Sequence, residues 1–358
     1  MKRIILLGAT GSVGTGACDV VRAHPDEFKV VALAARTSRA AAEALALEFG
    51  ARAYVGDDAA LRAVEENDAD LVLVATVGLS GLAPTLAAIE KGIPVALATK
   101  EVLVAAGALV MSRAREKGVP VIPVDSEHSA IFQCLGDEAS RHAIARITLT
   151  ASGGPFLYGP EDLSTVTPAM AMRHPPWRMG PKVTIDSATM MNKGFEIVEA
   201  HWLFGVPYEA IDVVIHPESI VHSLVTFTDG ATLAQLSPPD MRLPIQYALS
   251  WPDRLPAERV KLDLPALGAL TFRAPDAARF PALDLVREAA AAGSAKLAAL
   301  SAADEMAVAR FLAGEIVFTD IVRLVADVVA RMPATPCDSL DAVLAADAEA
   351  RTAAAHLH

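Results

Sequence analysis

The sequence predicts an α/β fold that opens with a doubly wound parallel sheet, continues through a central α/β domain and ends in a helical bundle. The chain starts with a short apolar run, followed at once by a glycine-rich turn and a helical pattern. Strand-length apolar segments then alternate with helical segments over the first 124 residues, which is typical of a parallel sheet covered by helices. The composition is 53% hydrophobic but only 5% aromatic, as expected for aliphatic strands buried on both faces.

Length and charge limit the classes of protein that fit. With 358 residues, two or three domains are expected. The net charge of −12 argues against nucleic-acid binding, which needs a basic surface. No apolar run approaches the roughly 18 residues of a membrane span. The three cysteines are far apart and form no Cys-x-x-Cys motif, so neither a disulfide framework nor a zinc site is expected, and a cytoplasmic location fits.

The first strand leads directly into a glycine-rich turn, Gly8-Ala9-Thr10-Gly11-Ser12-Val13-Gly14. A turn of this kind between a strand and a helix seats a pyrophosphate on the helix N-terminus. Gly8 allows the tight turn, Gly11 lets the backbone approach the phosphates, and Gly14 permits close packing of helix on strand. The alternative is a glycine turn without a ligand, but the strand before it and the helix after it favour a Rossmann-type dinucleotide site.

The end of the second expected strand, Lys29 to Ala34, indicates which dinucleotide is bound. An NAD site usually has an acid near this position to bind the ribose 2′-hydroxyl. This chain has Arg36, Thr37 and Ser38 instead, and a cation here favours a 2′-phosphate and therefore NADP(H). The alternative is an ordinary solvated loop arginine.

Strands and helices continue to alternate through the first domain, as a doubly wound sheet requires. The expected strands are residues 4–7, 29–34, 53–55, 71–75, 94–98 and 119–124, and the expected helices are 41–50, 59–66, 84–91 and 105–117. Lys100 and Glu101 follow the fifth strand, at the edge where open α/β sheets bind their ligands.

An acidic segment, Asp125-Ser126-Glu127-His128, follows the sixth strand. If the chain stays extended there, Asp125 and Glu127 point the same way, because strand side chains repeat every two residues. Two converging carboxylates suit a hard divalent cation such as Mg²⁺ or Mn²⁺. The alternative is a solvated acidic turn, and a third carboxylate, Glu196, tips the balance toward a metal.

Residues 186–196 concentrate an unusual set of polar groups. Ser187, Asn192 and Lys193 can together hold a phosphate, and Glu196 lies one helical turn beyond Lys193, so it can face the same cavity. The alternative is a Ser or Thr cap opening a helix with a solvated face. That alternative explains Gly194 poorly, because a helical glycine costs about 1 kcal/mol relative to alanine.

Two loops add further candidates. Ser152, followed by two glycines, can present a hydroxyl and free backbone N–H groups to a phosphate, although a simple turn before Pro155 is the alternative. Residues 174–182 contain three prolines and a glycine, which favours a mobile loop with Trp177 as a lid and His174 as a ligand contact. The alternative is a tryptophan anchored in the core.

The remaining chain completes the domain layout. Three strands, with a hairpin turn at Asp229-Gly230, are expected within residues 213–235. Residues 282–332 and 338–355 carry apolar side chains at helical spacing. We therefore expect a cofactor domain over residues 1–124, a catalytic domain over 125–250, a linker over 251–276 and a helical packing domain over 277–358.

These motifs together closely resemble 1-deoxy-D-xylulose 5-phosphate reductoisomerases over essentially the whole chain. The segments that carry the resemblance, besides Gly8 to Gly14 and Asp125 to His128, are Lys100-Glu101, Ser152 to Phe156, His174 to Trp177, Met179-Gly180, Asp186 to Gly194, His216-Pro217, His222-Ser223, Ala234 to Leu236 and Pro239 to Arg242. The resemblance implies reduction and isomerisation of 1-deoxy-D-xylulose 5-phosphate by NADPH to 2-C-methyl-D-erythritol 4-phosphate. This is the committed step of the non-mevalonate route to isoprenoid precursors.

The resemblance also implies a homodimer, inhibition by fosmidomycin, a divalent metal (Mg²⁺ or Mn²⁺, with Co²⁺ as a further option) and a role for each matching residue. The implied metal ligands are Asp125, Glu127 and Glu196. The implied catalytic and substrate residues are Lys100, Ser126, Ser152, His174, Trp177, Ser187, Asn192 and Lys193, together with the three metal ligands. The implied cofactor contacts are Thr10, Gly11, Ser12, Val13, Arg36, Thr37, Ser38, Thr99, Glu101 and Gly180.

The chain departs from the family pattern at a few positions. Arg36 and Ser38 stand where the family usually has glycine and often asparagine, and Thr99 replaces an asparagine; the first two bear on ribose binding. Pro176 is rare in the family and would stiffen the lid.

Two rival functions remain. A simple NADP-dependent dehydrogenase would need no metal site, and a catalytically dead NADP(H) sensor would have no need of Asp125, Glu127, Lys193 or Glu196.

Overall fold

The computed structural model describes residues 1–136, 138–173, 180–257 and 261–357, which form two compact units. The first unit comprises Met1–Val102, Val110–Ser129 and Asp240–Val260, and the second comprises Leu103–Leu109, Ala130–Pro239 and Lys261–His358. His174, Pro176 and Trp177 lie outside the described residues, and so does the expected lid.

A six-stranded parallel sheet forms the centre of the first unit, and its order is β3-β2-β1-β4-β5-β6. The order reverses between β1 and β4, and this switch point is where doubly wound folds bind ligands. The predicted doubly wound sheet is confirmed. Its strands are β1 (Lys2–Leu7), β2 (Phe28–Ala35), β3 (Arg52–Val55), β4 (Leu71–Val74), β5 (Val95–Leu97) and β6 (Val121–Pro123).

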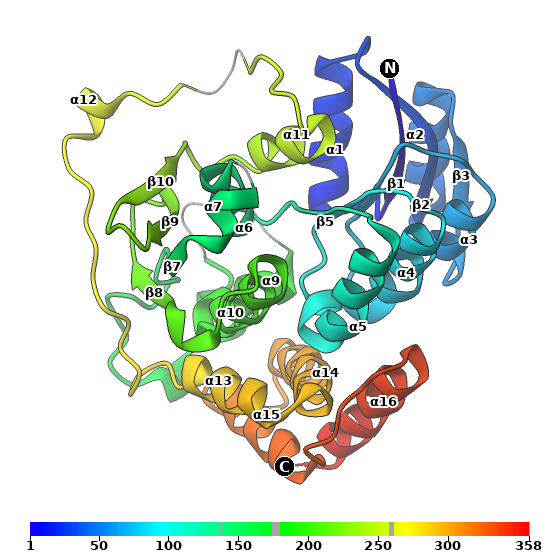
Figure 1. The fold of residues 1–358 in the computed structure, drawn as a ribbon. Helices are drawn as coiled ribbons and strands as arrows, with labels where there is room; N and C mark the ends of the chain where they lie inside the picture. Colours follow the sequence, from blue (N-terminus) through cyan, green and yellow to red (C-terminus); the bar gives the residue numbers. More distant parts are fainter. Residues whose placement is uncertain (137, 174–179, 258–260, 358) are drawn as a thin grey trace. The chain divides into compact units, whose positions relative to one another are not determined.

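Helices flank this sheet because its strands are apolar on both faces: all four residues from Ile4 to Leu7 are fully buried. Helix α1 packs beside α11, and α3 packs beside α4, on either side of the strands (Figure 1). The helices assigned to this part of the chain are α1 (Ser12–Ala23), α2 (Arg39–Phe49), α3 (Ala59–Glu65), α4 (Leu82–Glu90), α5 (Glu101–Lys117), α6 (Ser126–Leu135) and α11 (Arg242–Ser250).

Helix α11 joins the first unit although more than a hundred residues separate it from the preceding part of that unit. The Lys2 ammonium donates to the carbonyl oxygens of Leu249 and Trp251 at the C-terminal end of α11, at 2.9 Å each. His24, at the end of α1, pairs with Gln246 at 3.0 Å. The Lys2 bonds satisfy carbonyl groups that a helix end leaves open, and the His24–Gln246 pair holds α11 against the end of α1.

A four-stranded mixed sheet, in the order β10-β9-β7-β8, organises the first part of the second unit. Its strands are β7 (Ile144–Ala151), β8 (Ile211–Ile215), β9 (Val221–Phe227) and β10 (Thr232–Leu236). β9 and β10 pair antiparallel, and the Asp229 carboxylate accepts from the Ala231 N–H in the turn; the hairpin is confirmed. Other helices here are α7 (Glu138–His142), α8 (Pro168–Ala171), α9 (Pro181–Thr189) and α10 (Met191–Phe204).

Helices alone make up the end of the chain, as expected. Helix α14 is buried along most of its length and packs against α9, α13, α15 and α16. Between β10 and these helices, the described part of the linker contains one short helix, α12 (Leu264–Leu267). The C-terminal helices are α13 (Ala282–Ala292), α14 (Ser294–Leu312), α15 (Asp320–Arg331) and α16 (Leu340–His356).

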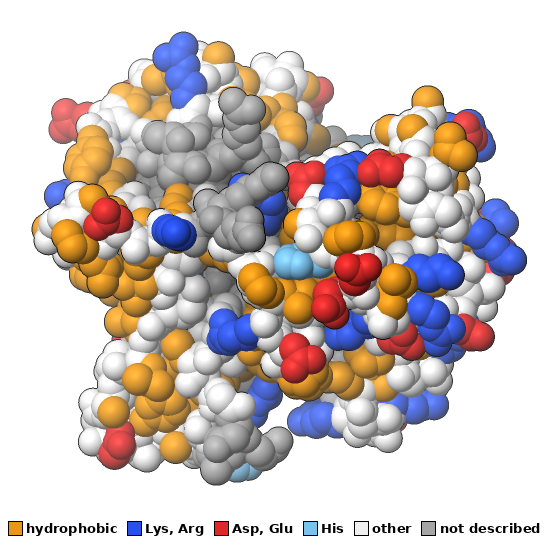
Figure 2. All heavy atoms as spheres, turned by 90° about the horizontal axis from the view of Figure 1, so that it is seen from above, with side chains coloured by type: hydrophobic (Ala, Val, Ile, Leu, Met, Phe, Trp, Pro, Cys, Tyr) orange, Lys and Arg blue, Asp and Glu red, His pale blue; other side chains and the backbone are white. Residues whose placement is uncertain are grey.

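The surface shows no single-sign character on the face seen in Figure 2. Acidic and basic side chains are interspersed there over the described residues. Within the described ranges, none of the helices combines the length and apolar character of a membrane span.

Candidate functional site

A cavity of about 200 Å³ lies at the carboxyl edge of the first unit's sheet, beside the glycine-rich turn. Gly8, Thr10 and Gly11 line it. Gly8 has a φ of +79°, and a Cβ there would lie 2.2 Å from the Ala75 carbonyl oxygen, so only glycine fits. A Cβ on Gly14 would also lie 2.2 Å from the Gly8 carbonyl oxygen. The turn therefore needs glycines to bring α1 against the strand ends, as a pyrophosphate site requires.

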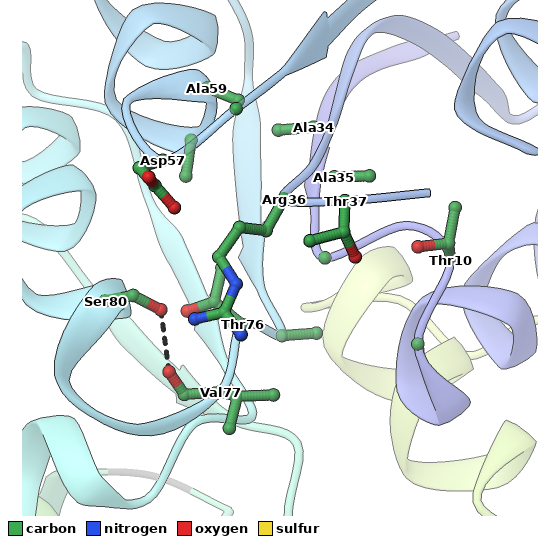
Figure 3. A pocket seen from close by; sticks show the side chains of 15 residues that line it. Thr10, Ala34, Ala35, Arg36, Thr37, Asp57, Ala59, Thr76, Val77 and Ser80 are labelled. Atoms are coloured by element: carbon green, nitrogen blue, oxygen red, sulfur yellow. Dashed lines mark hydrogen bonds between the residues drawn. The ribbon is translucent and has the colours of Figure 1, made fainter. Parts of the chain in front are cut away.

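Arg36 occupies this cavity together with Thr37. Figure 3 shows its side chain leaving the end of β2 and crossing the cavity toward the loop that carries Thr76 and Val77. That loop is held in part by the Ser80 hydroxyl, which donates to the Val77 carbonyl at 2.7 Å. A guanidinium inside the dinucleotide cavity suits a phosphate better than a ribose hydroxyl.

Sequence reasoning missed three polar residues that line the same cavity, Asp57, Thr76 and Ser80. They follow the ends of β3 and β4, and that position relative to the strands was the signal that could have identified them. Thr99 acts behind the lining, because its hydroxyl donates to the Thr76 carbonyl at 2.8 Å.

The other expected cofactor residues are arranged around this cavity in different ways. Ser12 and Val13 open α1, Ser38 precedes α2, and Glu101 opens α5, all outside the lining. Gly180 precedes α9 and belongs to the second unit. The structure therefore brings Thr10, Gly11, Arg36 and Thr37 together in one cavity.

Lys100 and Asp125 form a largely buried ion pair at the neighbouring strand ends of the first unit. The Lys100 ammonium lies 2.8 Å from the Asp125 carboxylate, and their side chains are 9% and 13% exposed. Burial acts to raise the pKa of Asp125, but the Lys100 ammonium and the hydrogen-bonded His128 ring outweigh it and hold that pKa well below its usual range. Asp125 is therefore an anion at neutral pH, as a ligand of a hard cation must be.

The extended geometry expected for Asp125 and Glu127 is wrong. β6 ends at Pro123, and α6 begins at Ser126, so Glu127 lies in the first helical turn. The Asp125 carboxylate accepts the Glu127 backbone N–H at 3.2 Å, which is how an aspartate opens a helix. Glu127 in turn accepts the Ser126 hydroxyl at 2.7 Å. Both carboxylates remain at the helix N-terminus, although the two-residue strand period does not orient them.

In the second unit, α9 and α10 meet at a sharp corner. Met190 joins them with a φ of 65°, a left-handed conformation that a non-glycine residue rarely adopts. Ser187 lies in the last turn of α9, just before the corner, and Asn192 and Lys193 follow it in the first turn of α10. The fold thus gathers the polar residues of this segment around one turn.

Lys193 and Glu196 face each other across one turn of α10, as predicted. The Lys193 ammonium lies 2.5 Å from one Glu196 oxygen, and the Asn192 amide donates to the other at 2.7 Å. Glu196 is 1% exposed and Lys193 5%. The Asn192 amide and the Lys193 ammonium thus share one buried carboxylate. Both donors can turn to a bound phosphate when a cation takes their place on Glu196.

The Ser152 turn packs onto the same corner. Gly153 and Gly154 both have positive φ, 87° and 67°, and a Cβ on Gly154 would lie 2.7 Å from the Ser187 carbonyl oxygen. The Ser152 hydroxyl accepts the Gly154 N–H at 3.2 Å. The structure therefore brings the turn after β7 against Ser187, as a shared anion site needs.

Three family models match the chain and together cover most of it. The model for 1-deoxy-D-xylulose 5-phosphate reductoisomerase matches residues 4–54 and 42–107, and the model for its C-terminal domain matches 121–204. A further model, for the DXP reductoisomerase C-terminal domain, matches 236–353.

Curated relatives match over almost the full length. A 1-deoxy-D-xylulose 5-phosphate reductoisomerase from Ralstonia nicotianae is 49% identical and covers 99% of this chain and 98% of its own. Another from Symbiobacterium thermophilum is 51% identical with the same coverage. The chain belongs to the 1-deoxy-D-xylulose 5-phosphate reductoisomerase family.

Solved reductoisomerase structures share the whole fold. The Zymomonas mobilis reductoisomerase, solved with NADPH, superposes with a TM-score of 0.91 at 40% identity, covering 99% of this chain and 98% of that chain. A reductoisomerase solved with NADPH, fosmidomycin and magnesium gives a TM-score of 0.92 at 37% identity, with the same coverage. The fold class and the family expected from the sequence are both confirmed.

The residues of this reductoisomerase fit the groups named in those complexes. The cavity beside Gly8 and Arg36 combines a glycine turn with a guanidinium, the groups that suit a pyrophosphate and a 2′-phosphate. The oxygen donors of Asp125, Glu127 and Glu196 are the type that magnesium prefers.

Proposed function

We propose that the protein converts 1-deoxy-D-xylulose 5-phosphate to 2-C-methyl-D-erythritol 4-phosphate, using NADPH and a divalent cation. The observation that carries this proposal is the match to reductoisomerases over 99% of the chain. The cavity at the glycine-rich turn and the polar corner after α9 support it, because this reaction needs both a cofactor site and a phosphate site.

Asp125, Glu127 and Glu196 would hold the cation, Mg²⁺ or Mn²⁺. When bound, a cation of this kind polarises a carbonyl group and stabilises negative charge on oxygen. Lys100 keeps Asp125 ionised through the pair at 2.8 Å. This site set distinguishes the reductoisomerase from a simple dehydrogenase, which needs no such ligands, and from a sensor, which needs no chemistry.

Ser152, Ser187, Asn192 and Lys193 would bind the substrate phosphate, with Ser126 and His174 contacting the rest of the substrate and Trp177 covering it. The phosphate is remote from the reacting carbons. Its binding energy therefore serves to position the substrate. In this structure the positive charge of Lys193 is paired with Glu196 at 2.5 Å. A bound phosphate would become the new partner of that ammonium.

In the first unit, Thr10, Gly11, Ser12 and Val13 would bind the pyrophosphate, and Arg36, Thr37 and Ser38 the ribose 2′-phosphate. Thr99, Glu101 and Gly180 would contact the remainder of the cofactor. The proposed domain boundaries are those at 124, 250 and 276, except that residues 240–260 return to the cofactor domain. We further propose a homodimer and, on the basis of the free thiols of Cys18, Cys134 and Cys337, a cytoplasmic location.

The function is tested by following NADPH absorbance with 1-deoxy-D-xylulose 5-phosphate, with and without Mg²⁺ or Mn²⁺, and after adding EDTA. Metal-dependent oxidation that yields 2-C-methyl-D-erythritol 4-phosphate supports the proposal. NADPH binding without turnover under all of these conditions overturns it.

The ligand assignment is tested by Asp125→Asn and Glu196→Gln, which keep the shape of each side chain and remove its charge. Each variant should lose turnover or need far more metal for half-maximal rate. Either variant retaining full activity with an unchanged metal dependence would show that the ligands lie elsewhere.

A further inference from the structure

A buried charge cluster outside the proposed ligand sets links the polar corner to the C-terminal helices. The Lys182 ammonium, in the first turn of α9, lies 2.7 Å from the Asp186 carboxylate on the same helix and 2.8 Å from the Asp304 carboxylate on α14. The side chains of Asp186 and Asp304 are 2% and 0% exposed, and that of Lys182 is 17% exposed.

The same ammonium also contacts α10. It lies 4.6 Å from the centre of the Phe195 ring, within the range of a cation–π interaction. Phe195 is fully buried and directly precedes Glu196. One side chain thus contacts α9, α10 and α14.

We propose that Lys182 is a positioning residue that sets the angle between α9 and α10, and so the geometry of the substrate-phosphate site. Ser187 lies at the far end of α9 from Lys182, and Asn192 and Lys193 lie at the start of α10. A brace between the first turn of α9 and Phe195, early in α10, fixes the spacing of these groups at the corner. This inference rests on the proposed function for its assignment of the corner to a phosphate.

The charges explain why the brace is rigid. If the Lys182 ammonium moved away, the carboxylates of Asp186 and Asp304 would be left buried without its charge beside them. Buried charges that lose a partner are strongly destabilising, so the ammonium is held in place. Asp304 also ties α9 to the middle of α14. The C-terminal helices therefore have a role beyond packing, because they supply a charge that holds the substrate site in shape.

The test compares Lys182→Met, which keeps an unbranched side chain on Phe195 but removes the charge, with Lys296→Met as a matched control. Lys296 lies on α14, and its ammonium donates to the Val329 carbonyl on α15 at 2.9 Å, so the control removes a lysine contact of α14 without touching the brace. A third variant, Lys182→Met with Asp304→Asn, relieves the surplus buried negative charge in case the single variant folds poorly.

For Lys182→Met, with or without Asp304→Asn, we expect KM for the phosphorylated substrate to rise roughly ten- to a hundredfold, as misplacement of binding groups does. The value of kcat should change much less, and NADPH affinity should stay at the wild-type value. Lys182→Arg should restore most of the KM, and Lys296→Met should leave it unchanged even if its thermal midpoint falls.

A KM for Lys182→Met equal to those of wild type and Lys296→Met overturns the proposal and leaves the cluster a purely structural one. Wild-type turnover, measured first, tests the proposed function separately. If wild type does not turn over, thermal stabilisation by inorganic phosphate is the readout: stabilisation of wild type and Lys296→Met but not of Lys182→Met supports the brace, and equal responses of all three overturn it.

Discussion

Gly194 provides a direct test of how closely α10 must approach α13. A Cβ added at Gly194 would lie 2.6 Å from the Val286 Cγ2 and 3.1 Å from its Cβ, whereas ordinary van der Waals contact begins at 3.4 Å. Val286 is fully buried, and a valine cannot rotate away cheaply because its χ1 is restricted. Gly194→Ala must therefore push α10 away from α13.

The expected cost follows from two opposing terms. Overpacking of this kind costs about 1–3 kcal/mol, and the better helix propensity of alanine returns about 1 kcal/mol. We expect a net loss of up to roughly 2 kcal/mol, seen as a lower thermal midpoint. Because Lys193 and Glu196 flank Gly194 on α10, KM for the phosphorylated substrate should rise as well, with NADPH affinity unchanged.

Val286→Ala supplies the rescue, since it removes the methyl group that the new Cβ meets. The double variant should lose less free energy of unfolding than the sum of the losses of the two single variants. A double-mutant cycle measures this coupling. A Gly194→Ala protein as stable as wild type, or a cycle without coupling, would refute the steric reasoning.

Three further predictions concern the first unit and the thiols. Arg36→Ala should weaken NADPH binding roughly ten- to a hundredfold, through loss of a charge-assisted hydrogen bond, and leave NADH binding nearly unchanged; equal effects in fluorescence titrations of the two cofactors would contradict a 2′-phosphate role. Gly8→Ala should lower the thermal midpoint and abolish NADPH binding, because its Cβ would lie 2.2 Å from the Ala75 carbonyl oxygen; a variant that binds NADPH normally would show that the turn has room. Burial raises the pKa of the Cys18 and Cys134 thiols to about 11 from an ordinary 9.0. Because the thiolate is the reactive form, alkylation at neutral pH should be about a hundredfold slower in the folded chain than in the unfolded one, and rapid labelling of either cysteine in the native protein would count against this.

Local patterns predicted much of this molecule. Each βα unit of the first domain was readable from apolar runs and glycines, because strand and helix periods are properties of neighbouring residues. The facing of Lys193 and Glu196 followed from a three-residue helical spacing in the same way. Gly194 stood out as costly in a helix, and the structure supplies the reason in Val286.

Other features depended on partners distant in sequence. The chain turns into a helix at Ser126 because Asp125 caps it. From the sequence alone, an acidic segment after a strand could equally be a helix cap or a continuation of the strand. The role of Asp57 beside Arg36 depends on the order of strands in the sheet. Asp304 lies 122 positions from Lys182 in the sequence, and no local pattern connects them.

The return of α11 to the first unit has a consequence for how the protein can be cut and synthesised. A fragment that stops at residue 124 lacks Ile245, which is fully buried and meets the α1 surface at Gly16. It also leaves the Lys2 ammonium without the carbonyl groups of Leu249 and Trp251. During synthesis on the ribosome, the apolar side of α1 stays uncovered after the N-terminal sheet has emerged. It is covered only when about 120 more residues, up to α11, have been made. An isolated cofactor domain for screening would therefore need residues 240–260 grafted back, for example through a short linker after residue 129.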